Sequence, residues 1–239
     1  MLSKNEQKQI RLLGQKKHRS KLGFFIAEGE KIVQELVQED FELDTIFSSK
    51  EIDFAPYRLI DQETLNKVSH LKAASSILAI FKIPGIISTE QVSDSFSLAL
   101  DSVSDPGNLG TIIRLCDWFG IKNIFCSPDT VDCYNPKVIQ STMGSIARVN
   151  CHYVDLKNLI EQSKVPVYGA TLDGSSHYDL SFGKKGILVM GSESHGISAQ
   201  LLEKINQRVT IPANLPGKHA ESLNVATATA ILLAEISRP

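Results

Sequence analysis

The sequence lacks any apolar run that approaches the roughly 18 residues a membrane-spanning helix requires. Its first residues are polar and basic, and they lack the apolar core of a secretion signal. We therefore expect the chain to act in the cytoplasm and to have no membrane partner.

Cysteine is scarce as well, and the four cysteines at 116, 126, 133 and 151 form no metal-binding pattern. They include no C-x-x-C pair, and no histidines stand at zinc-ligand spacing. We therefore expect the cysteines to be free, buried thiols and the site to contain no metal.

Two nucleotide-binding patterns are also missing. No G-x-x-x-x-G-K-S/T occurs, and the loop from Gly191 to Gly196 is no dinucleotide fingerprint, because Glu193 stands where a pyrophosphate would be repelled. A nucleotide-dependent oxidoreductase is therefore a disfavoured alternative, which nicotinamide binding would reveal.

The chain has 239 residues, of which 42% are hydrophobic, which predicts one large or two small folded domains. Net charge is only −2, yet the first 21 residues carry seven Lys or Arg against Glu6 alone. That local excess predicts a nucleic-acid contact, for which Lys16, Lys17 and Arg19 are our candidates. An ordinary solvated helix face remains the alternative.

Hydrophobic periodicity divides the chain into a small α/β unit over 1–82, a linker over 83–95 and a second domain over 96–239. The first unit shows a basic helix over 3–18, strands over 24–27, 43–47 and 77–81, and helices near 32–37 and 61–69. The second domain alternates strands (98–103, 123–126, 165–170, 187–190, 208–211) with helices (109–119, 136–147, 156–162, 199–205, 222–236). This alternation predicts an α/β fold with a mainly parallel sheet that helices cover on both faces.

Three polar clusters follow strands of this sheet, where open α/β sheets bind ligands. The first, over 105–110, offers Asn108 as a cap of the next helix, with Arg114 one to two turns further on. The second is the 191–196 loop, whose His195 is interpreted as a loop histidine in preference to a general base. The third precedes the last helix, where Ser222 and Asn224 are expected in the first turn. Each cluster alone is also explained by an ordinary turn or cap.

Together the clusters resemble the signature of the SpoU (TrmH-type) RNA ribose methyltransferases of the SPOUT class. The matching segments are Asn108-x-Gly110-x-x-x-Arg114, residues 188–196 with Gly191, Glu193 and Gly196, Ile211-Pro212, and residues 222–226. The N-terminal segment 25–31 also resembles the small substrate-binding domain that many members carry.

This resemblance implies a C-terminal trefoil knot, a homodimer packed through it, and bound S-adenosylmethionine. Cofactor contacts are implied for Thr171, Gly191, Gly196, Ile211 and Leu223. A catalytic constellation is implied for Asn108, Arg114, Glu193, Ser222 and Asn224. The chain departs from the family pattern at Ser192 and Ser194, at Ala213, and in a longer loop between Ile211 and Ser222.

The family's suspected proton acceptor is Arg114, but a guanidinium is not deprotonated near neutral pH. We expect Arg114 to anchor a phosphate and to stabilise a developing alkoxide, oriented by Glu193. The leading hypothesis is an S-adenosylmethionine-dependent RNA 2′-O-methyltransferase that acts on ribosomal RNA. A transfer-RNA methyltransferase and a catalytically silent RNA-binding or ribosome-assembly protein are the alternatives.

Overall fold

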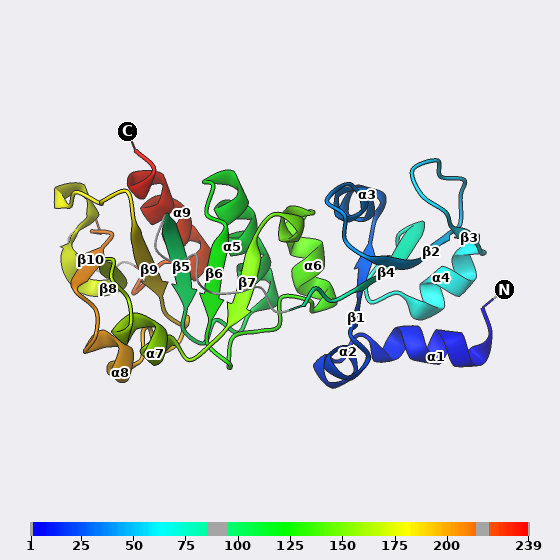
Figure 1. Cartoon of the computed structure of the whole chain (residues 1–239), viewed down its shortest axis with the longest axis horizontal. Coiled ribbons are helices and arrows are strands. Elements are labelled where there is room, and N and C mark those ends of the chain that lie inside the picture. The colour runs from blue at the N-terminus through cyan, green and yellow to red at the C-terminus, as the bar shows by residue number, and fades with distance from the viewer. Residues whose placement is uncertain (1, 86–94, 214–219, 239) are drawn as a thin grey trace. The chain divides into compact units, whose positions relative to one another are not determined.

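The structure is a computed structural model that describes residues 2–85, 95–213 and 220–238 (Figure 1). The chain forms two compact units. The first comprises Met1–Ile86 together with Asp132–Arg148, and the second comprises Ile87–Val131 together with Val149–Pro239. Each unit has its own sheet.

The first unit is built on a four-stranded mixed sheet in the order β1-β4-β2-β3. Its strands are β1 (Phe24–Glu28), β2 (Leu43–Ser48), β3 (Arg58–Leu59) and β4 (Ile77–Lys82). Strand β4 is antiparallel to β1 and β2, and β3 is parallel to β2. The helices are α1 (Lys4–Leu12), α2 (Lys16–Leu22), α3 (Glu30–Gln38), α4 (Gln62–Val68) and α6 (Pro136–Thr142), with a 3₁₀ turn at Ser145–Ala147.

The single basic helix predicted over 3–18 is in fact two helices. Ser3 and Glu6 form a capping box that starts α1, and the helix ends at its C-cap Leu13. A side chain at Gly14 would meet the His70 ring, since an added Cβ would lie 2.3 Å from it. The chain turns at this close approach, and α2 follows in a different direction.

The second unit contains a six-stranded sheet in the order β10-β8-β9-β5-β6-β7, and every neighbouring pair is parallel. The strands are β5 (Phe96–Leu100), β6 (Asn123–Cys126), β7 (Asn150–Tyr153), β8 (Val167–Ser176), β9 (Gly186–Met190) and β10 (Gln207–Thr210). Every residue of the central strands β5 and β9 is buried, as expected for a sheet covered on both faces. The predicted parallel α/β sheet is confirmed.

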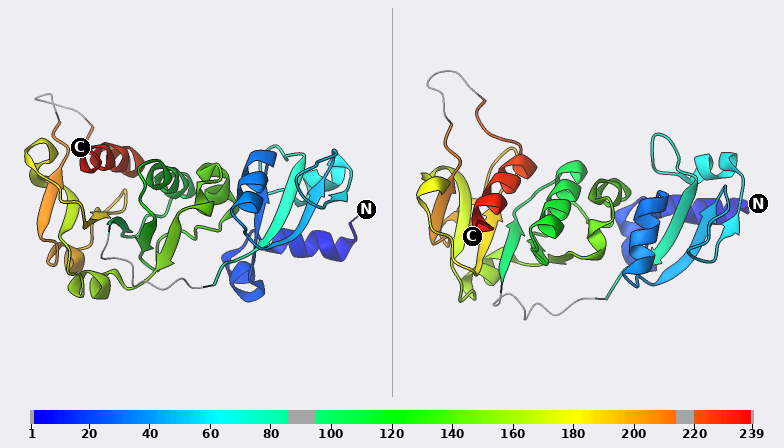
Figure 2. Two further views of the ribbon diagram at one scale, coloured as in Figure 1. Left: turned by 45° about the horizontal axis from the view of Figure 1, so that its top comes forward. Right: turned by 90° about the horizontal axis from the view of Figure 1, so that it is seen from above.

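Helices cover both faces of this sheet (Figure 2). Helices α5 (Pro106–Trp118) and α9 (Val225–Ile236) pack against each other on one face, and α7 (Leu156–Glu161) and α8 (Ala199–Leu202) lie on the other. A short 3₁₀ turn, η3, spans His177–Asp179. The face beneath α7 and α8 has a core of buried residues: Ala99, Phe125, Leu156, Ile160, Val167, Ile187, Val189, Ile197 and Leu201.

Several predicted bounds shift, and two strands, the two-residue β3 and β7, were not predicted. Strand β7 has the pattern Asn-Cys-His-Tyr at a sheet edge, where only His152 is fully buried, so its hydrophobic signal is weak. The last helix begins at Val225, three residues later than predicted. Most of the predicted linker, residues 86–94, lies outside the described residues, as do residues 214–219 of the loop before Ser222.

Candidate active site

Two polar loops of the second unit are neighbours because the strands before them are neighbours. Leu100, the last residue of β5, is in register with Met190, the last residue of β9. Asp101 and Gly191 therefore leave the sheet side by side, at the carboxyl edge where parallel sheets bind ligands.

Helix α5 begins immediately after the first loop, and Asp105 is its N-cap. The Asp105 carboxylate accepts a hydrogen bond from the Asn108 backbone N–H at 2.8 Å, and Pro106 occupies the first helical turn. The prediction that Asn108 caps this helix is therefore wrong. Asn108 lies inside the first turn, and its amide side chain is available for other contacts.

A series of hydrogen bonds joins the three polar clusters. The Asn224 Nδ2 group donates to Asn108 Oδ1 at 2.9 Å, and Asn108 Nδ2 donates to Glu193 Oε1 at 2.6 Å. Asn224 Oδ1 in turn accepts from the backbone N–H groups of Ala226 and Thr227 at 2.9 and 3.3 Å. We call this series the amide relay. It brings together residues separated by 85 and 116 positions in the sequence.

The direction of the relay is fixed at both ends. A carboxylate only accepts hydrogen bonds, so Asn108 must present its NH₂ group to Glu193 and its oxygen to Asn224. Helix N–H groups only donate, so Asn224 must present its oxygen to α9 and its NH₂ group to Asn108. Neither amide can be reversed without the loss of at least two bonds. The relay therefore holds the Glu193 carboxylate near the N-termini of α5 and α9, whose dipoles favour negative charge.

The loop after β9 is a tight turn that only glycine permits at Gly191. A Cβ there would lie 2.1 Å from the Gly196 carbonyl carbon and 2.2 Å from the Ile197 nitrogen. Ser192 and Gly196 exchange backbone hydrogen bonds of 3.0 Å, and Gly196 has φ of +66°. The loop therefore turns back on itself and exposes Glu193, Ser194 and His195.

A buried carboxylate anchors the far end of this loop. Asp101 is only 6% exposed, and its Oδ2 accepts from the Ser198 backbone N–H at 2.7 Å. Asp101 was not predicted as a site residue, because nothing in the sequence links it to a residue 97 positions away. The capping role of Asp105 was not predicted either, although an Asp before a Pro is a recognisable helix start.

Arg114 and Ser222 do not join the relay. Arg114 is exposed on α5, and within the described residues its guanidinium has no hydrogen bond or ion pair. The expectation that Glu193 orients Arg114 is wrong, because the described bond of that carboxylate goes to Asn108. Ser222 is exposed and precedes α9, so it does not lie in the first helical turn as predicted, whereas Asn224 is the N-cap.

The residues implied in cofactor binding lie on several elements of the second unit, with Thr171 inside β8, Ile211 just after β10 and Leu223 just before α9. Leu223 is 48% exposed next to the relay, and Ile211 is half-buried just after β10. Thr171 lies where β8 bulges away from β10, since Gly169 pairs with Arg208 and the next pair is Ser175 with Val209.

The three candidate RNA contacts on α2 divide into two kinds. Lys16 and Lys17 are exposed. Arg19 is only 1% exposed, and its guanidinium donates to Asp132 at 2.9 and 2.5 Å and to the Leu13 carbonyl at 2.8 Å. Because this guanidinium is buried and bonded within the first unit, the prediction that Arg19 contacts RNA is wrong in this structure.

None of the four cysteines forms a disulfide bond. Three of them are buried, as predicted, and Cys151 is half-buried. Burial, with a smaller contribution from Asp117, raises the pKa of the Cys116 thiol far above its usual value, so this thiol stays protonated. No group of three His, Cys, Asp or Glu residues suited to a metal occurs in the described part of the chain.

None of the helices in residues 2–85, 95–213 and 220–238 has the length and apolar character needed to cross a membrane.

Comparison with known proteins matches both units. The model of the SpoU rRNA Methylase family matches residues 95–234, and that of the MRM3-like substrate binding domain matches residues 4–79. The 23S rRNA (guanosine(2553)-2′-O)-methyltransferase RlmP of Bacillus subtilis is 32% identical, over 97% of this chain and 96% of its own.

Two solved structures superpose on nearly the whole chain. An AdoMet-bound rRNA methyltransferase from Sinorhizobium meliloti has a TM-score of 0.85 and 27% identity, over 99% of this chain and 96% of that one. A protein from Porphyromonas gingivalis, described as of the TrmH family of RNA methyltransferases, has a TM-score of 0.86 and 35% identity, over 99% and 98% of the two chains.

Proposed function

The chain belongs to the SpoU rRNA methylase family and is an RNA methyltransferase, and from this premise we propose that it methylates a ribose 2′-hydroxyl of ribosomal RNA with S-adenosylmethionine. The observation that carries the proposal is the amide relay, which connects all three polar clusters at one edge of the sheet. A relative that is 32% identical over almost its full length is a 23S rRNA 2′-O-methyltransferase, which supports ribosomal RNA as the substrate.

The side chains at this edge fit a sulfonium cofactor. S-adenosylmethionine supplies a methyl group already activated by the positive sulfur, so no metal is needed to activate it. Leu223 offers an exposed apolar surface beside the relay, and the Glu193 carboxylate provides negative charge to complement the sulfonium. Gly191, Gly196, Ile211 and Thr171 are proposed to complete the cofactor site.

The protein's task is then to position a ribose and to stabilise charge on its 2′-oxygen. Arg114 is exposed, and its guanidinium has no partner among the described residues, so it can bind an RNA phosphate and stabilise the developing alkoxide. The relay fixes Glu193, Asn108 and Asn224 in one arrangement before substrate arrives, so that little reorganisation is needed during transfer. Ser222 is proposed to contact the substrate or cofactor from the exposed segment before α9.

The N-terminal unit is proposed to hold the RNA, through exposed basic side chains that include Lys16 and Lys17. We also propose action in the cytoplasm, a trefoil knot in the second unit and a homodimer packed through it. The partly covered apolar side chains of α9, among them Ile231 and Ile236, support such an interface. Light scattering of the purified chain tests the dimer.

A methyl-transfer assay tests the function. Labelled S-adenosylmethionine is incubated with total RNA that lacks modification, and the RNA is then separated into ribosomal and transfer fractions and digested to nucleosides. We expect label in 2′-O-methylated nucleosides of the ribosomal fraction. Label in the transfer fraction alone would overturn the substrate assignment, and retention of full activity by both Arg114→Ala and Asn108→Ala would overturn the assigned site.

A further inference from the structure

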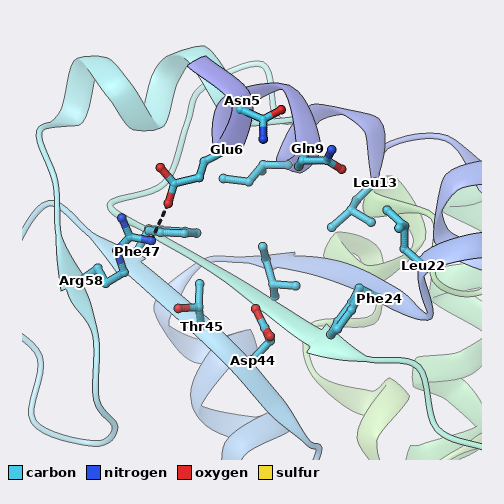
Figure 3. Close-up of a pocket in the computed structure, with 12 residues that line it drawn as sticks. Asn5, Glu6, Gln9, Leu13, Leu22, Phe24, Asp44, Thr45, Phe47 and Arg58 are labelled. Carbon is cyan, nitrogen blue, oxygen red and sulfur yellow. Dashed lines mark hydrogen bonds and ion pairs between the residues drawn. The ribbon is translucent and has the colours of Figure 1, made fainter. Parts of the chain in front are cut away.

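The first unit contains a hollow of about 330 Å³ between α1 and the sheet, within the size range of small-ligand sites (Figure 3). Its floor is apolar and aromatic, with Phe24, Phe47 and Ile80 among the lining residues. Phe24 and Ile80 are only partly buried, so part of the core of this unit is left open to the hollow. Asn5 and Gln9 on α1 present amide groups above this floor (Figure 3).

A β-bulge places a carboxylate in the wall of the hollow. In the pairing of β2 with β4, Leu43 is opposite Phe81 and Thr45 is opposite Ile80, so Asp44 is an extra residue on β2. Bulges commonly redirect a side chain at a functional site. Here the bulge leaves Asp44 exposed on the lining of the hollow, beside Thr45.

The two acidic residues that line the hollow, Glu6 and Asp44, differ in their hydrogen bonding. Glu6 accepts from Arg58 at 2.8 Å and from the Ser3 backbone N–H at 2.7 Å. The hydrogen bond from Arg58, together with those from Ser3, lowers the pKa of Glu6 to about 2. Asp44 has no hydrogen bond or ion pair within the described residues, so its two oxygens remain available as acceptors.

The Glu6–Arg58 pair also fixes one end of the hollow. The Arg58 guanidinium lies 5.2 Å from the centre of the Phe47 ring, which holds that ring and the ion pair together. The site therefore combines an apolar floor, amide groups on one side and, on the other, the Asp44 carboxylate, which has no partner in the part of the chain that the structure describes.

We propose that this hollow binds a guanine base that is unstacked from the RNA substrate, an inference that rests on the proposed function. Proteins recognise RNA mainly through such unstacked bases, which pack on apolar or aromatic surfaces and are hydrogen-bonded along their edges. Guanine presents two adjacent N–H donors, N1–H and N2–H, to which the two oxygens of Asp44 are complementary. The neighbouring helices supply exposed cations for the flanking phosphates, among them Lys4, Lys8, Arg11 and Lys17.

The inference predicts a base preference that depends on Asp44. Fluorescence anisotropy at fixed salt measures the affinity of the full chain for two fluorescein-labelled oligouridine 12-mers. One carries a central guanosine, and the other carries inosine at that position, which lacks the N2 amino group. We expect wild type to favour guanosine by about tenfold, the discrimination typical of a bidentate base contact. Asp44→Asn and Asp44→Ala should bring the two affinities to within about twofold.

A matched control removes an exposed carboxylate of the same unit that does not line the hollow, with Asp53→Asn. This variant should keep the guanosine preference, although loss of one negative charge raises its affinity for both oligomers. Equal affinity of wild type for the two oligomers, or an unchanged preference in both Asp44 variants, overturns the inference. Methyl transfer to total RNA is measured on the same preparations, so a wild type that methylates RNA without a guanosine preference refutes this site and leaves the proposed function standing.

Discussion

Asn224 has two roles that a pair of substitutions can separate. Its oxygen caps α9, and its NH₂ group donates to Asn108. Asn224→Ala removes both, whereas Asn224→Asp keeps a side-chain oxygen for the cap and removes the donor. The relay then fails, because Asn108 cannot present its NH₂ group to the carboxylates of both Glu193 and the new side chain.

The expected magnitudes follow from these bonds. Loss of an N-cap costs about 1 kcal/mol, which lowers the melting temperature of a chain of this size by roughly 2–4 °C. Asn224→Asp should cost less than about 0.5 kcal/mol, because Asp caps helices as well as Asn does. In activity, a hydrogen bond to a charged group is worth about 1.5–3 kcal/mol, so both variants should lower kcat/KM for methyl transfer by about tenfold or more.

Thermal unfolding and single-turnover methyl transfer measure the two effects. Asp155→Ala is the matched control, since Asp155 caps α7 of the same unit through the Lys157 and Asn158 N–H groups. It should reproduce the stability loss of Asn224→Ala without the loss of activity. Full activity in Asn224→Asp would refute a catalytic role for the relay, as would an equal loss of activity in Asp155→Ala.

Three further predictions concern other contacts. Gly191→Ala should abolish S-adenosylmethionine binding, measured by calorimetry, because the alanine Cβ would lie only 2.1–2.2 Å from backbone atoms of the loop. Circular dichroism should show that the variant is folded, and an undiminished affinity for the cofactor would contradict the prediction. Asp132→Ala leaves the Arg19 guanidinium buried without its carboxylate, so it should lower the free energy of unfolding, measured in urea, by about 3 kcal/mol. The control Glu63→Ala breaks an exposed ion pair and should lower the free energy of unfolding by less than about 0.5 kcal/mol. Burial lowers the pKa of His152 in the folded state, so the unfolded chain binds the proton more tightly, and the stability present above pH 6.5 is lost as the pH falls through the folded-state pKa. His152→Gln should therefore lose less stability than wild type between pH 7.5 and 5, and parallel pH profiles would show that His152 is not responsible.

The features that the sequence predicted are those that local patterns encode. The apolar runs of β5 and β9 indicate strands buried on both faces, and the polar residues that follow them lie at one edge because parallel strands end together. The partners within that edge were not predictable. Nothing local to Glu193 shows that its carboxylate meets Asn108 and not Arg114, since the choice depends on how α5, α9 and the 191–196 loop pack.

Arg19 illustrates the same limit for charge. A cluster of basic residues near the N-terminus is equally consistent with an RNA contact and with a folded core, and local sequence does not reveal a carboxylate 113 positions away. The break after α1 decides the outcome, because it starts a second helix on which Lys17 faces solvent and Arg19 is buried. Charge counts therefore predicted where a nucleic-acid surface could form, but not which cations belong to it.

The relay also explains why a polar cluster can open an apolar helix. The first N–H groups of α9 need acceptors, and Asn224 provides one oxygen for two of them. Its NH₂ group donates to Asn108, and the NH₂ group of Asn108 donates to Glu193. Hydrogen bonds in such a series strengthen one another. The same bonds that start α9 thus hold a carboxylate at the site, so the stability of this helix end and the geometry of the site depend on one set of contacts.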